Sequence, residues 1–289
     1  MHHKADKSLS IVIPVFNEQV AVNRTVQLVA KQCADWPVEI IVVDDGSEKP
    51  IEIEGTHAPR LDLKVLRLFQ NQGRSRARNV GASDCKGDFI TFLDADCEPC
   101  IDYISAIFDY IHQGYTLFAG HLVFKNSNKF LEAFENKNQI NRVNAGEKWP
   151  LYWTSANLTV DKNLFIAVSG FSEDYKGYGF EDRDFLIRVS DLMINQKVGY
   201  NIAAMVVHSD DVTLDEYNSK FYRSGLDSAR QFATIHPKAY AEMHYSFFDV
   251  NQNKLLSFLP KKVLRSCASI VRHLASATFY RISDESTSV

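Results

Sequence analysis

Short runs of β-branched and aliphatic residues alternate with amphipathic helical patterns along the N-terminal third of the chain. Strands are predicted at residues 10–15, 38–43, 63–68 and 89–93, and helices at residues 18–31, 74–83 and 101–112. Strands that alternate with helices form βαβ units with right-handed crossovers, and such units build a mostly parallel sheet. We therefore predict an α/β fold in which a Rossmann-like, mostly parallel sheet is flanked by helices.

Polar side chains follow three of these predicted strands, at the point where each strand ends. They are Asn17 and Glu18, Asp44 and Asp45, and Asp94 and Asp96. Ligands of open α/β sheets bind at the carboxyl ends of the strands, so we expect these side chains to share one edge of the sheet. Carboxylates suit hard divalent cations such as Mg²⁺ or Mn²⁺. An isolated Asp-x-Asp is more often a solvated turn. The choice between a turn and a cation site therefore depends on the other segments of the sequence.

Five segments carry a resemblance to a known family. In order, they are SIVIPVFNE at 10–18, IVVDDGS at 41–47, NQGRSRARNVG at 71–81, GDFITFLDAD at 87–96 and GFEDRDF at 179–185. Their order and spacing, across roughly residues 10–208, resemble the family 2 glycosyltransferases, which have the nucleotide-sugar-binding GT-A fold. Each segment alone is a weak signal, whereas the five together are highly specific.

The resemblance implies an inverting enzyme with a GT-A fold. Such an enzyme moves a sugar from a nucleotide-sugar, expected here to be a UDP-linked hexose, to an acceptor hydroxyl on a glycan or a glycolipid. It also implies a cation, Mn²⁺ or Mg²⁺, as the cofactor. The cation's role is to neutralise the negative charge that develops on the nucleoside diphosphate as the sugar leaves.

The resemblance assigns eight residues to the nucleotide-sugar site: Pro14, Phe16, Glu18, Asp45, Asn71, Arg74, Asp94 and Ala95. Among these, Asp45 is expected to hydrogen-bond a uracil-type base, and Asp94 to touch the ribose. A turn or helix-cap role is the alternative for Asp45. Arg76 and Arg78 belong to the same segment as Arg74, and for them a structural pairing with nearby acids stays open.

The resemblance further implies that Asp96 ligates the cation between the two donor phosphates. His208 follows a strand predicted at residues 200–207 and occupies the place of a late metal-binding histidine in similar proteins. We therefore expect His208 to be a further protein ligand. The alternative is a purely structural histidine.

Glu181 and Asp182 open a helix predicted at residues 181–194, directly after Gly179. In similar proteins the Asp of this motif is the general base and the Glu binds the acceptor, so Asp182 is expected to take the acceptor hydroxyl's proton. The alternative is helix capping, because acidic residues in a first turn interact favourably with the helix dipole. That alternative also accounts for Asp184. For Trp153 two roles stay open, stacking on an acceptor sugar ring and packing in the core.

The predicted organisation is a catalytic domain over residues 1–211, with a donor half at about 1–100 and an acceptor half at about 101–211. A C-terminal helical extension follows at 212–289. Within it, apolar residues recur at helical spacing over 263–274, and Lys262, Arg265 and Arg272 fall on the opposite side. A basic amphipathic helix suits an anionic membrane surface. Packing against the catalytic domain is the alternative.

The composition limits which binding partners and which cellular compartment the sequence supports. With 32 basic and 36 acidic residues the net charge is -4, which gives no support for a nucleic-acid partner. Five scattered cysteines favour reduced thiols. Cys97 and Cys100 lack a second pair that would complete a zinc site, so we expect two small buried residues. With no secretory signal and no apolar run of about 20 residues, a cytoplasmic protein is expected, at most peripheral on the inner face of a membrane.

Three other functions compete with glycosyl transfer. A GT-A-like domain that binds a nucleotide-sugar or polysaccharide without catalysis is the main rival, although such a domain needs no general base. A dehydrogenase is disfavoured because no Gly-x-Gly-x-x-Gly follows the first predicted strand. A phosphate-loop ATPase is disfavoured because Gly-x-x-x-x-Gly-Lys does not occur.

Overall fold

The computed structural model describes residues 7–54, 61–126, 128–146, 149–193, 196–209, 213–226 and 228–243. The chain divides into two compact units, residues 1–231 and residues 232–289. The second is described only over 232–243, so the amphipathic segment 263–274 lies outside the described residues. The predicted division at residue 211 between a catalytic domain and an extension stays a prediction. Among the described helices, none has the length and apolar character that crossing a bilayer requires.

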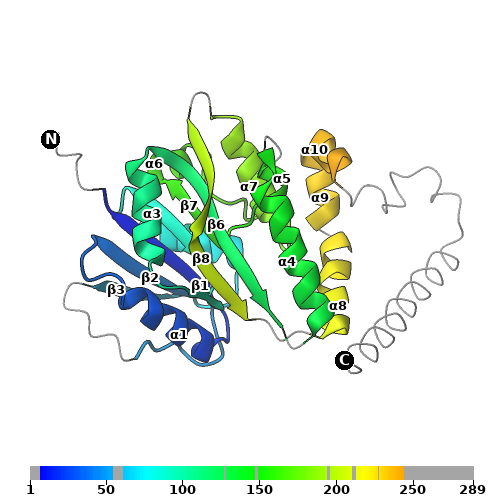
Figure 1. Ribbon diagram of the computed structural model, residues 1–289. Coiled ribbons are helices and arrows are strands. Elements are labelled where there is room, and N and C mark those ends of the chain that lie inside the picture. The colour runs from blue at the N-terminus through cyan, green and yellow to red at the C-terminus, as the bar shows by residue number, and fades with distance from the viewer. Residues whose placement is uncertain are drawn as a thin grey trace, which may run out of the picture. The chain divides into compact units, whose positions relative to one another are not determined.

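The helices and strands alternate as the N-terminal sequence predicts. In chain order they are β1 (Leu9–Val15), α1 (Gln19–Ala30), β2 (Val38–Asp44), β3 (Asp62–Arg67), α2 (Arg74–Asp84), β4 (Phe89–Leu93), β5 (Cys97–Pro99), α3 (Tyr103–His112), β6 (Tyr115–Lys125), α4 (Lys129–Val143), α5 (Trp149–Tyr152), β7 (Asn157–Asp161), α6 (Lys162–Ala167), α7 (Glu181–Ser190), β8 (Lys197–Ser209), α8 (Leu214–Leu226), α9 (Ser228–Ile235) and α10 (Pro237–Glu242) (Figure 1). Every strand and helix predicted in the N-terminal third forms, and no end differs by more than two residues.

The described strands form one eight-stranded sheet in the order β3-β2-β1-β4-β7-β6-β8-β5. The pairs within β3-β2-β1-β4 are parallel, as is the pair β6–β8. Antiparallel pairs join β7 to β4 and to β6, and β5 to β8. The predicted mostly parallel sheet is confirmed, and its antiparallel members lie in the half that follows β4.

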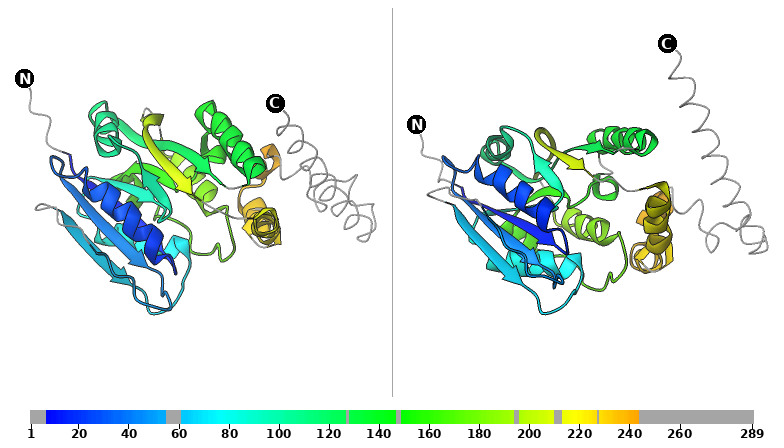
Figure 2. Two further views of the ribbon diagram at one scale, coloured as in Figure 1. Left: turned by 60° about the horizontal axis from the view of Figure 1, so that its bottom comes forward. Right: turned by 90° about the horizontal axis from the view of Figure 1, so that it is seen from below.

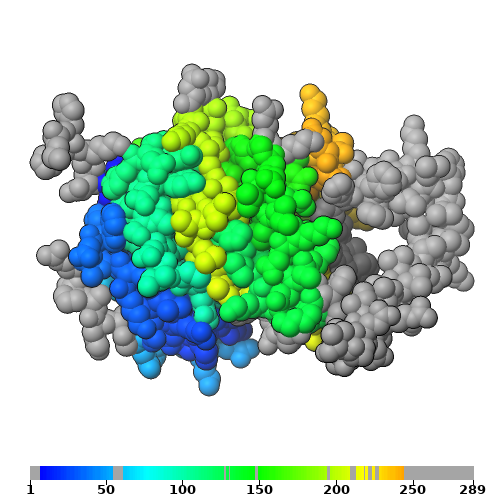
Figure 3. Space-filling view, in the orientation of Figure 1, coloured from blue at the N-terminus to red at the C-terminus, as the bar shows by residue number. Residues whose placement is uncertain are grey.

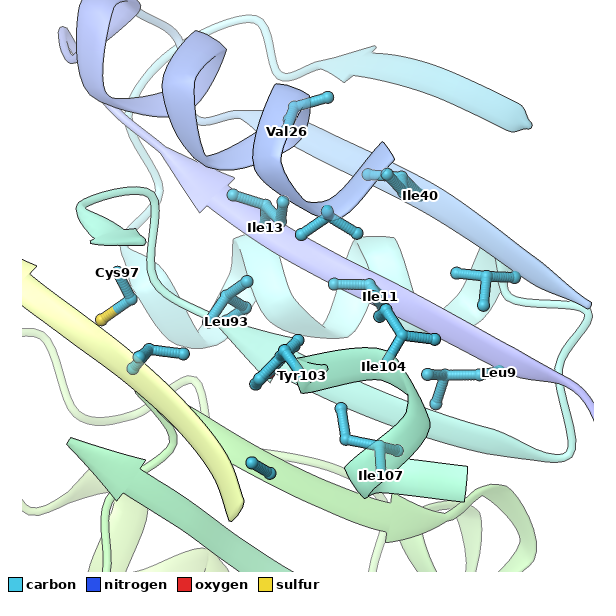
Figure 4. Close-up of a cluster of buried hydrophobic side chains, with 14 of the residues drawn as sticks. Leu9, Ile11, Ile13, Val26, Ile40, Leu93, Cys97, Tyr103, Ile104 and Ile107 are labelled. Carbon is cyan, nitrogen blue, oxygen red and sulfur yellow. The ribbon is translucent and has the colours of Figure 1, made fainter. Parts of the chain in front are cut away.

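Two hydrophobic clusters fill the two faces of the sheet. Because side chains alternate along a strand, Ile11 and Ile13 of β1 pack into one cluster and Val12 into the other. α1 and α3 cover the first face, with Val26 and Tyr103 among the buried contacts (Figures 1 and 4). α2, α6 and α7 contribute to the second cluster (Figure 2). Each fully buried aliphatic side chain contributes about 1.5–3 kcal/mol, so the sheet and its helices form a rigid base for the strand ends.

The carboxyl end of β1 lies at a topological switch point. β1 pairs with β2 on one side and with β4 on the other, so the chain runs outward through β2 and β3 and then returns across β1. Ligands of such sheets bind at this position. β7 begins at the same edge, since Asn157 pairs with Leu93 at the end of β4, and β8 ends there. The predicted convergence of polar strand ends at one edge is therefore confirmed for β1, β2 and β4.

Candidate active site

Asp96 and His208 lie side by side at this edge. Asp96 Oδ2 is 3.3 Å from His208 Nε2, because β5 begins directly after Asp96 and pairs Cys97 with His208 of β8. The His208 ring packs against Phe124, with ring centroids 5.0 Å apart. A carboxylate oxygen beside an imidazole nitrogen is a donor set that suits Mn²⁺. The two residues predicted to ligate a cation are thus brought together and fit that role.

Cys97 lies directly beside this pair. One ligand atom from each of Asp96, Cys97 and His208 falls within 4.8 Å of the others. Burial and the neighbouring carboxylates raise the pKa of the Cys97 thiol well above its usual value. Cys97 is buried as expected, whereas Cys100 is only half-buried.

Arg78 of α2 connects the two groups of carboxylates. Its guanidinium is 3% exposed; Nη2 donates to Asp94 Oδ1 at 2.8 Å, and Nη1 lies 3.6 Å from Glu181 Oε1 and 3.9 Å from Asp182 Oδ1. Burial alone would lower the pKa of Arg78, but the carboxylates outweigh it and raise the pKa above its ordinary value. The same guanidinium, with Arg74, holds the pKa of Asp94 below its usual range despite burial. One permanent cation therefore separates the Asp94 carboxylate from those of Glu181 and Asp182.

Asp182 lies in the first turn of α7, and the two residues before this helix have left-handed backbone conformations. Gly179 has φ +82° and Phe180 has φ +73°, and left-handed backbone at a non-glycine residue such as Phe180 is typical of functional sites. Ser155, which is fully buried, donates a hydrogen bond from Oγ to Asp182 Oδ1 at 2.5 Å. Asp184 pairs instead with Arg188 on the same helix at 2.7 Å. The ion pair within α7 thus explains Asp184, whereas Asp182 is held by Ser155, a residue outside α7.

Glu181 is almost completely buried. Its side chain is 2% exposed, and Oε1 lies 3.5 Å from Arg74 Nε and 3.6 Å from Arg78 Nη1. Burial and the Asp182 carboxylate raise the pKa of Glu181, and the two arginines offset only part of that rise. In this structure Glu181 faces the two guanidinium groups, and its predicted acceptor role stays a prediction.

The segment Ser155–Ala156–Asn157 holds three parts of this edge together. Ser155 binds Asp182, and the Ala156 carbonyl accepts a hydrogen bond from the Asp94 backbone at 3.1 Å. The Asn157 amide donates to the Ala204 carbonyl at 3.0 Å and accepts from the Tyr103 hydroxyl at 2.9 Å. The spacing between Asp94, Asp182 and β8 is therefore set by three consecutive residues.

Comparison with known proteins agrees with this geometry. The model of the family described as "Glycosyl transferase family 2" matches residues 10–172, more than half of the chain. The chain belongs to glycosyl transferase family 2. A second model, described as "N-terminal domain of galactosyltransferase", matches residues 138–207, which include Ser155 and Asp182.

Two curated relatives are each longer than this family 2 chain. The pre-mycofactocin glycosyltransferase of Mycobacterium tuberculosis is 25% identical over 248 residues, which are 80% of this chain and 48% of the relative. An undecaprenyl-phosphate 4-deoxy-4-formamido-L-arabinose transferase of Pectobacterium atrosepticum is 34% identical over 116 residues, which are 38% of this chain and 35% of the relative. The chain thus spans about half, or less, of these relatives.

Solved structures share the fold. A mannosyltransferase of Pyrobaculum calidifontis, PcManGT, in complex with GDP-Man and Mn²⁺, has a TM-score of 0.62 at 17% identity and covers 98% of this chain and 80% of its own. S. aureus TarS 1-349 has a TM-score of 0.56 at 18% identity, over 85% of this chain and 78% of its own. These likenesses show that the family 2 chain has the GT-A fold.

The residues predicted at the donor side come from four strand ends and one helix start. Pro14 belongs to β1, and Phe16 and Glu18 follow it; Asp45 follows β2, Asn71 follows β3, Arg74 begins α2, and Asp94 and Ala95 follow β4. Both carboxylate oxygens of Asp45 accept backbone hydrogen bonds, from Gln72 at 2.8 Å and Gly73 at 2.9 Å. Asp45 therefore holds the loop that carries Asn71, which agrees with its alternative turn role, and contact with a base stays a prediction. Phe16, Glu18, Asn71 and Arg74 are exposed at the same edge.

Two predicted contacts are directed into the core instead. Trp153 is 4% exposed; its ring packs against Trp149 and Tyr200, and its Nε1 donates to the Arg142 carbonyl at 3.1 Å. Stacking of Trp153 on an acceptor sugar is therefore wrong for this structure, and core packing is the alternative that holds. Ala95 is 5% exposed, and its carbonyl accepts a hydrogen bond from Thr25 at 2.7 Å. Only its neighbours Asp94 and Asp96 present side chains at the edge.

Sequence reasoning missed Ser155 and the place of Cys97 beside the cation pair. One sequence feature could have placed Cys97 in the site, since it directly follows Asp96 and precedes an extended segment. The feature for Ser155 was weaker, because it is only a small polar residue just before a strand. Arg78 was left open as a structural partner for acids, and that role is the one it has.

We expect Ser155→Ala to lower kcat for sugar transfer about tenfold and to leave the KM for the donor nearly unchanged. The reason is that a buried hydrogen bond to a charged group is worth about 1.5–3 kcal/mol and fixes the Asp182 carboxylate. Steady-state kinetics would check this, with Ser83→Ala on the exposed face of α2 as the control. Ser155→Thr, which keeps the hydroxyl, should recover part of kcat. Equal losses in the Ala and Thr variants would argue against the hydrogen bond.

Proposed function

We propose that this family 2 chain is an inverting glycosyltransferase that moves a sugar from a nucleotide-sugar to an acceptor hydroxyl. The observation that carries the proposal is Arg78, which places Asp94 and Asp182 on two sides of one buried guanidinium, at the edge that also holds Asp96 and His208. A non-catalytic sugar-binding domain would not require a positioned base, and the hydrogen bond from Ser155 to Asp182 favours an enzyme over that rival.

In the proposed reaction, the acceptor hydroxyl gives its proton to Asp182 as its oxygen bonds to the anomeric carbon. The bond between that carbon and the nucleoside diphosphate breaks on the opposite face, so the configuration inverts. Asp96 and His208 would hold Mn²⁺ or Mg²⁺, which when bound supplies positive charge for the leaving diphosphate. Arg74, which is 43% exposed and lies 3.5 Å from Glu181, adds a fixed positive charge near the same place.

The identities of donor and acceptor belong to this proposal. We infer a UDP-linked hexose as the donor, although the solved neighbours were captured with different nucleotides, UDP-GlcNAc in TarS and GDP-Man in PcManGT. The names of two relatives indicate different acceptor classes. The name undecaprenyl-phosphate 4-deoxy-4-formamido-L-arabinose transferase indicates a lipid phosphate. The name of the chondroitin synthase of Pasteurella multocida indicates a glycan. We keep a glycan or lipid-linked acceptor, and contact of segment 263–274 with the cytoplasmic face of a membrane, as inferences from the sequence.

A thermal-shift screen of nucleotide-sugars with and without Mn²⁺ tests the donor site directly. A ligand that binds only the folded protein raises its Tm, so we expect a UDP-sugar with Mn²⁺ to give the largest shift. Asp96→Asn and His208→Ala should each weaken Mn²⁺ binding at least about tenfold, measured by titration calorimetry. His112→Ala, at the far end of α3, is the matched control. Undiminished Mn²⁺ binding in both site variants would remove the pair from the cation site.

A further inference from the structure

A cavity of about 470 Å³ opens at the end of the sheet opposite the edge that holds the candidate active site. Residues 34–37 line it directly before β2, Lys7 lines it two residues before β1, and His112 lines it at the end of α3. Figure 3 shows that α3 borders the blue N-terminal segments on the left of the molecule. Small-molecule sites in proteins have volumes of about 300–1,000 Å³, so the cavity is large enough for a ligand of that size.

The length of β1 separates this cavity from the candidate active site. β1 has 7 residues, and each residue of a strand adds about 3.3 Å. The cavity at the amino ends of the strands therefore lies about 20 Å from their carboxyl ends. A small ligand in the cavity would not reach the reacting groups, so it would occupy a second site.

Aromatic side chains form the apolar part of the cavity. The Trp36 indole is half-buried and stacks on the buried Phe108, with ring centroids 4.4 Å apart and the ring planes inclined by 13°. Phe108 also packs against the His112 ring, with centroids 6.0 Å apart. Because Phe108 holds the plane of the indole, the exposed part of Trp36 lines the cavity in a fixed orientation.

The polar groups of the cavity are available to a ligand. Within the part of the chain that the structure describes, Trp36 Nε1 donates no hydrogen bond and the Asp35 carboxylate accepts none. Lys7 Nζ lies 4.0 Å from Asp88 Oδ1, and both side chains are 45% exposed. That separation exceeds hydrogen-bond length, so the ion pair leaves the donors of the ammonium group available. An indole N–H, an ammonium group and a carboxylate thus lie around one aromatic surface.

We propose that this cavity is a second carbohydrate-binding site, which takes a neutral saccharide. A sugar ring has an apolar C–H face that can pack on the Trp36 indole, and each of its hydroxyls both donates and accepts hydrogen bonds. Asp35 accepts from such hydroxyls, whereas Lys7 and Trp36 Nε1 donate to them. The charges of Lys7 and Asp35 cancel, so the cavity does not select for a multiply charged anion such as a nucleoside diphosphate. Such a site would retain a glycan chain away from its reacting end.

The test uses the full chain with ¹⁵N-labelled tryptophan, without a cation and without a nucleotide-sugar. Cellotetraose, chitotetraose and mannotetraose are titrated separately while the indole N–H signals of the 3 tryptophans are followed by NMR. The signal of Trp36 is assigned from the variant Trp36→Phe. We expect at least one saccharide to shift the Trp36 signal in a saturable manner. The Trp153 signal should stay in place, because this N–H is bonded to the Arg142 carbonyl in the core.

The variant Asp35→Ala tests the polar contacts, with Asp109→Ala as the matched control. Both residues are exposed, and Asp109 lies on α3 outside the lining of the cavity. A hydrogen bond to a charged group is worth about 1.5–3 kcal/mol, so we expect saccharide affinity to fall at least about tenfold in Asp35→Ala and to stay native in Asp109→Ala. Substitutions at exposed positions change stability little, so equal Tm values would show that both variants are folded.

Three results would each overturn the proposal. They are a Trp36 signal that none of the three saccharides moves, shifts confined to the other two tryptophans, and equal affinities in Asp35→Ala and Asp109→Ala. Because these titrations involve no sugar transfer, a failure here would leave the proposed reaction intact. Conversely, saccharide binding at Trp36 would stand even if the chain proved not to be a transferase.

Discussion

Asp182→Asn should lower the rate of sugar transfer by about 10²–10⁴-fold, because general-base catalysis contributes that much and an amide cannot take the acceptor's proton. The amide can still accept the hydrogen bond from Ser155, so the side chain should keep its position. Donor affinity should change little, since the nucleotide-sugar is expected on the Asp94 side of Arg78. Single-turnover rates and donor titrations would separate the two effects.

Asp191→Asn provides the matched control for this substitution. Asp191 is exposed and sits at the other end of the same helix, so the chemical change is identical while the site is untouched. We expect native transfer rates in Asp191→Asn. A transfer rate in Asp182→Asn within a few-fold of the native rate would require a different base.

Arg78→Met should reduce the free energy of unfolding by about 3–5 kcal/mol, the usual result of removing one partner from a buried ionic cluster. The substitution leaves Asp94, Glu181 and Asp182 without their shared counter-charge, so they would repel one another or take up protons. Chemical denaturation near neutral pH would measure the loss. Transfer activity should also fall, because both the donor-side and the acceptor-side carboxylates lose their common support.

Arg76→Met is the comparison for this second prediction. Arg76 lies two residues away on α2, is 44% exposed and pairs with Glu173 at 3.3 Å, and exposed ion pairs contribute at most about 1 kcal/mol. Arg78→Lys should recover part of the lost stability, since it restores the charge but not the forked geometry. If Arg78→Met unfolded at the same denaturant concentration as Arg76→Met, the buried cluster would have no stabilising role.

The N-terminal half could be predicted from the sequence because its signals are local. Buried parallel strands appear as continuous apolar runs, which is why β1, β2 and β4 were found almost to the residue. The carboxylates that follow them were predicted to converge because parallel strands end at one edge. Asp96 and His208, far apart in the sequence, were paired through the family resemblance, and the structure places them 3.3 Å apart.

The acceptor half was harder to predict because its strands are not simple apolar patterns. β7 contains Asn157 and Thr159, two buried polar residues. Their side chains form hydrogen bonds with other strands and with α3, such as the bond between Thr159 and Thr91 at 2.7 Å and that from Tyr103 to Asn157 at 2.9 Å. β6 changes register against β8 between Gly120 and His121. The environments of Ser155 and Trp153 arise from such tertiary contacts. The sequence alone therefore left the role of Trp153 open and did not reveal the role of Ser155.

The segment from Ser155 to Asn157 has a consequence for redesign of this enzyme. Because three adjacent residues fix the base, the donor-side loop and a distant strand at once, a single insertion or deletion there would disturb both substrates together. Redesign for a new acceptor should therefore leave this tripeptide intact and keep the length of its backbone unchanged.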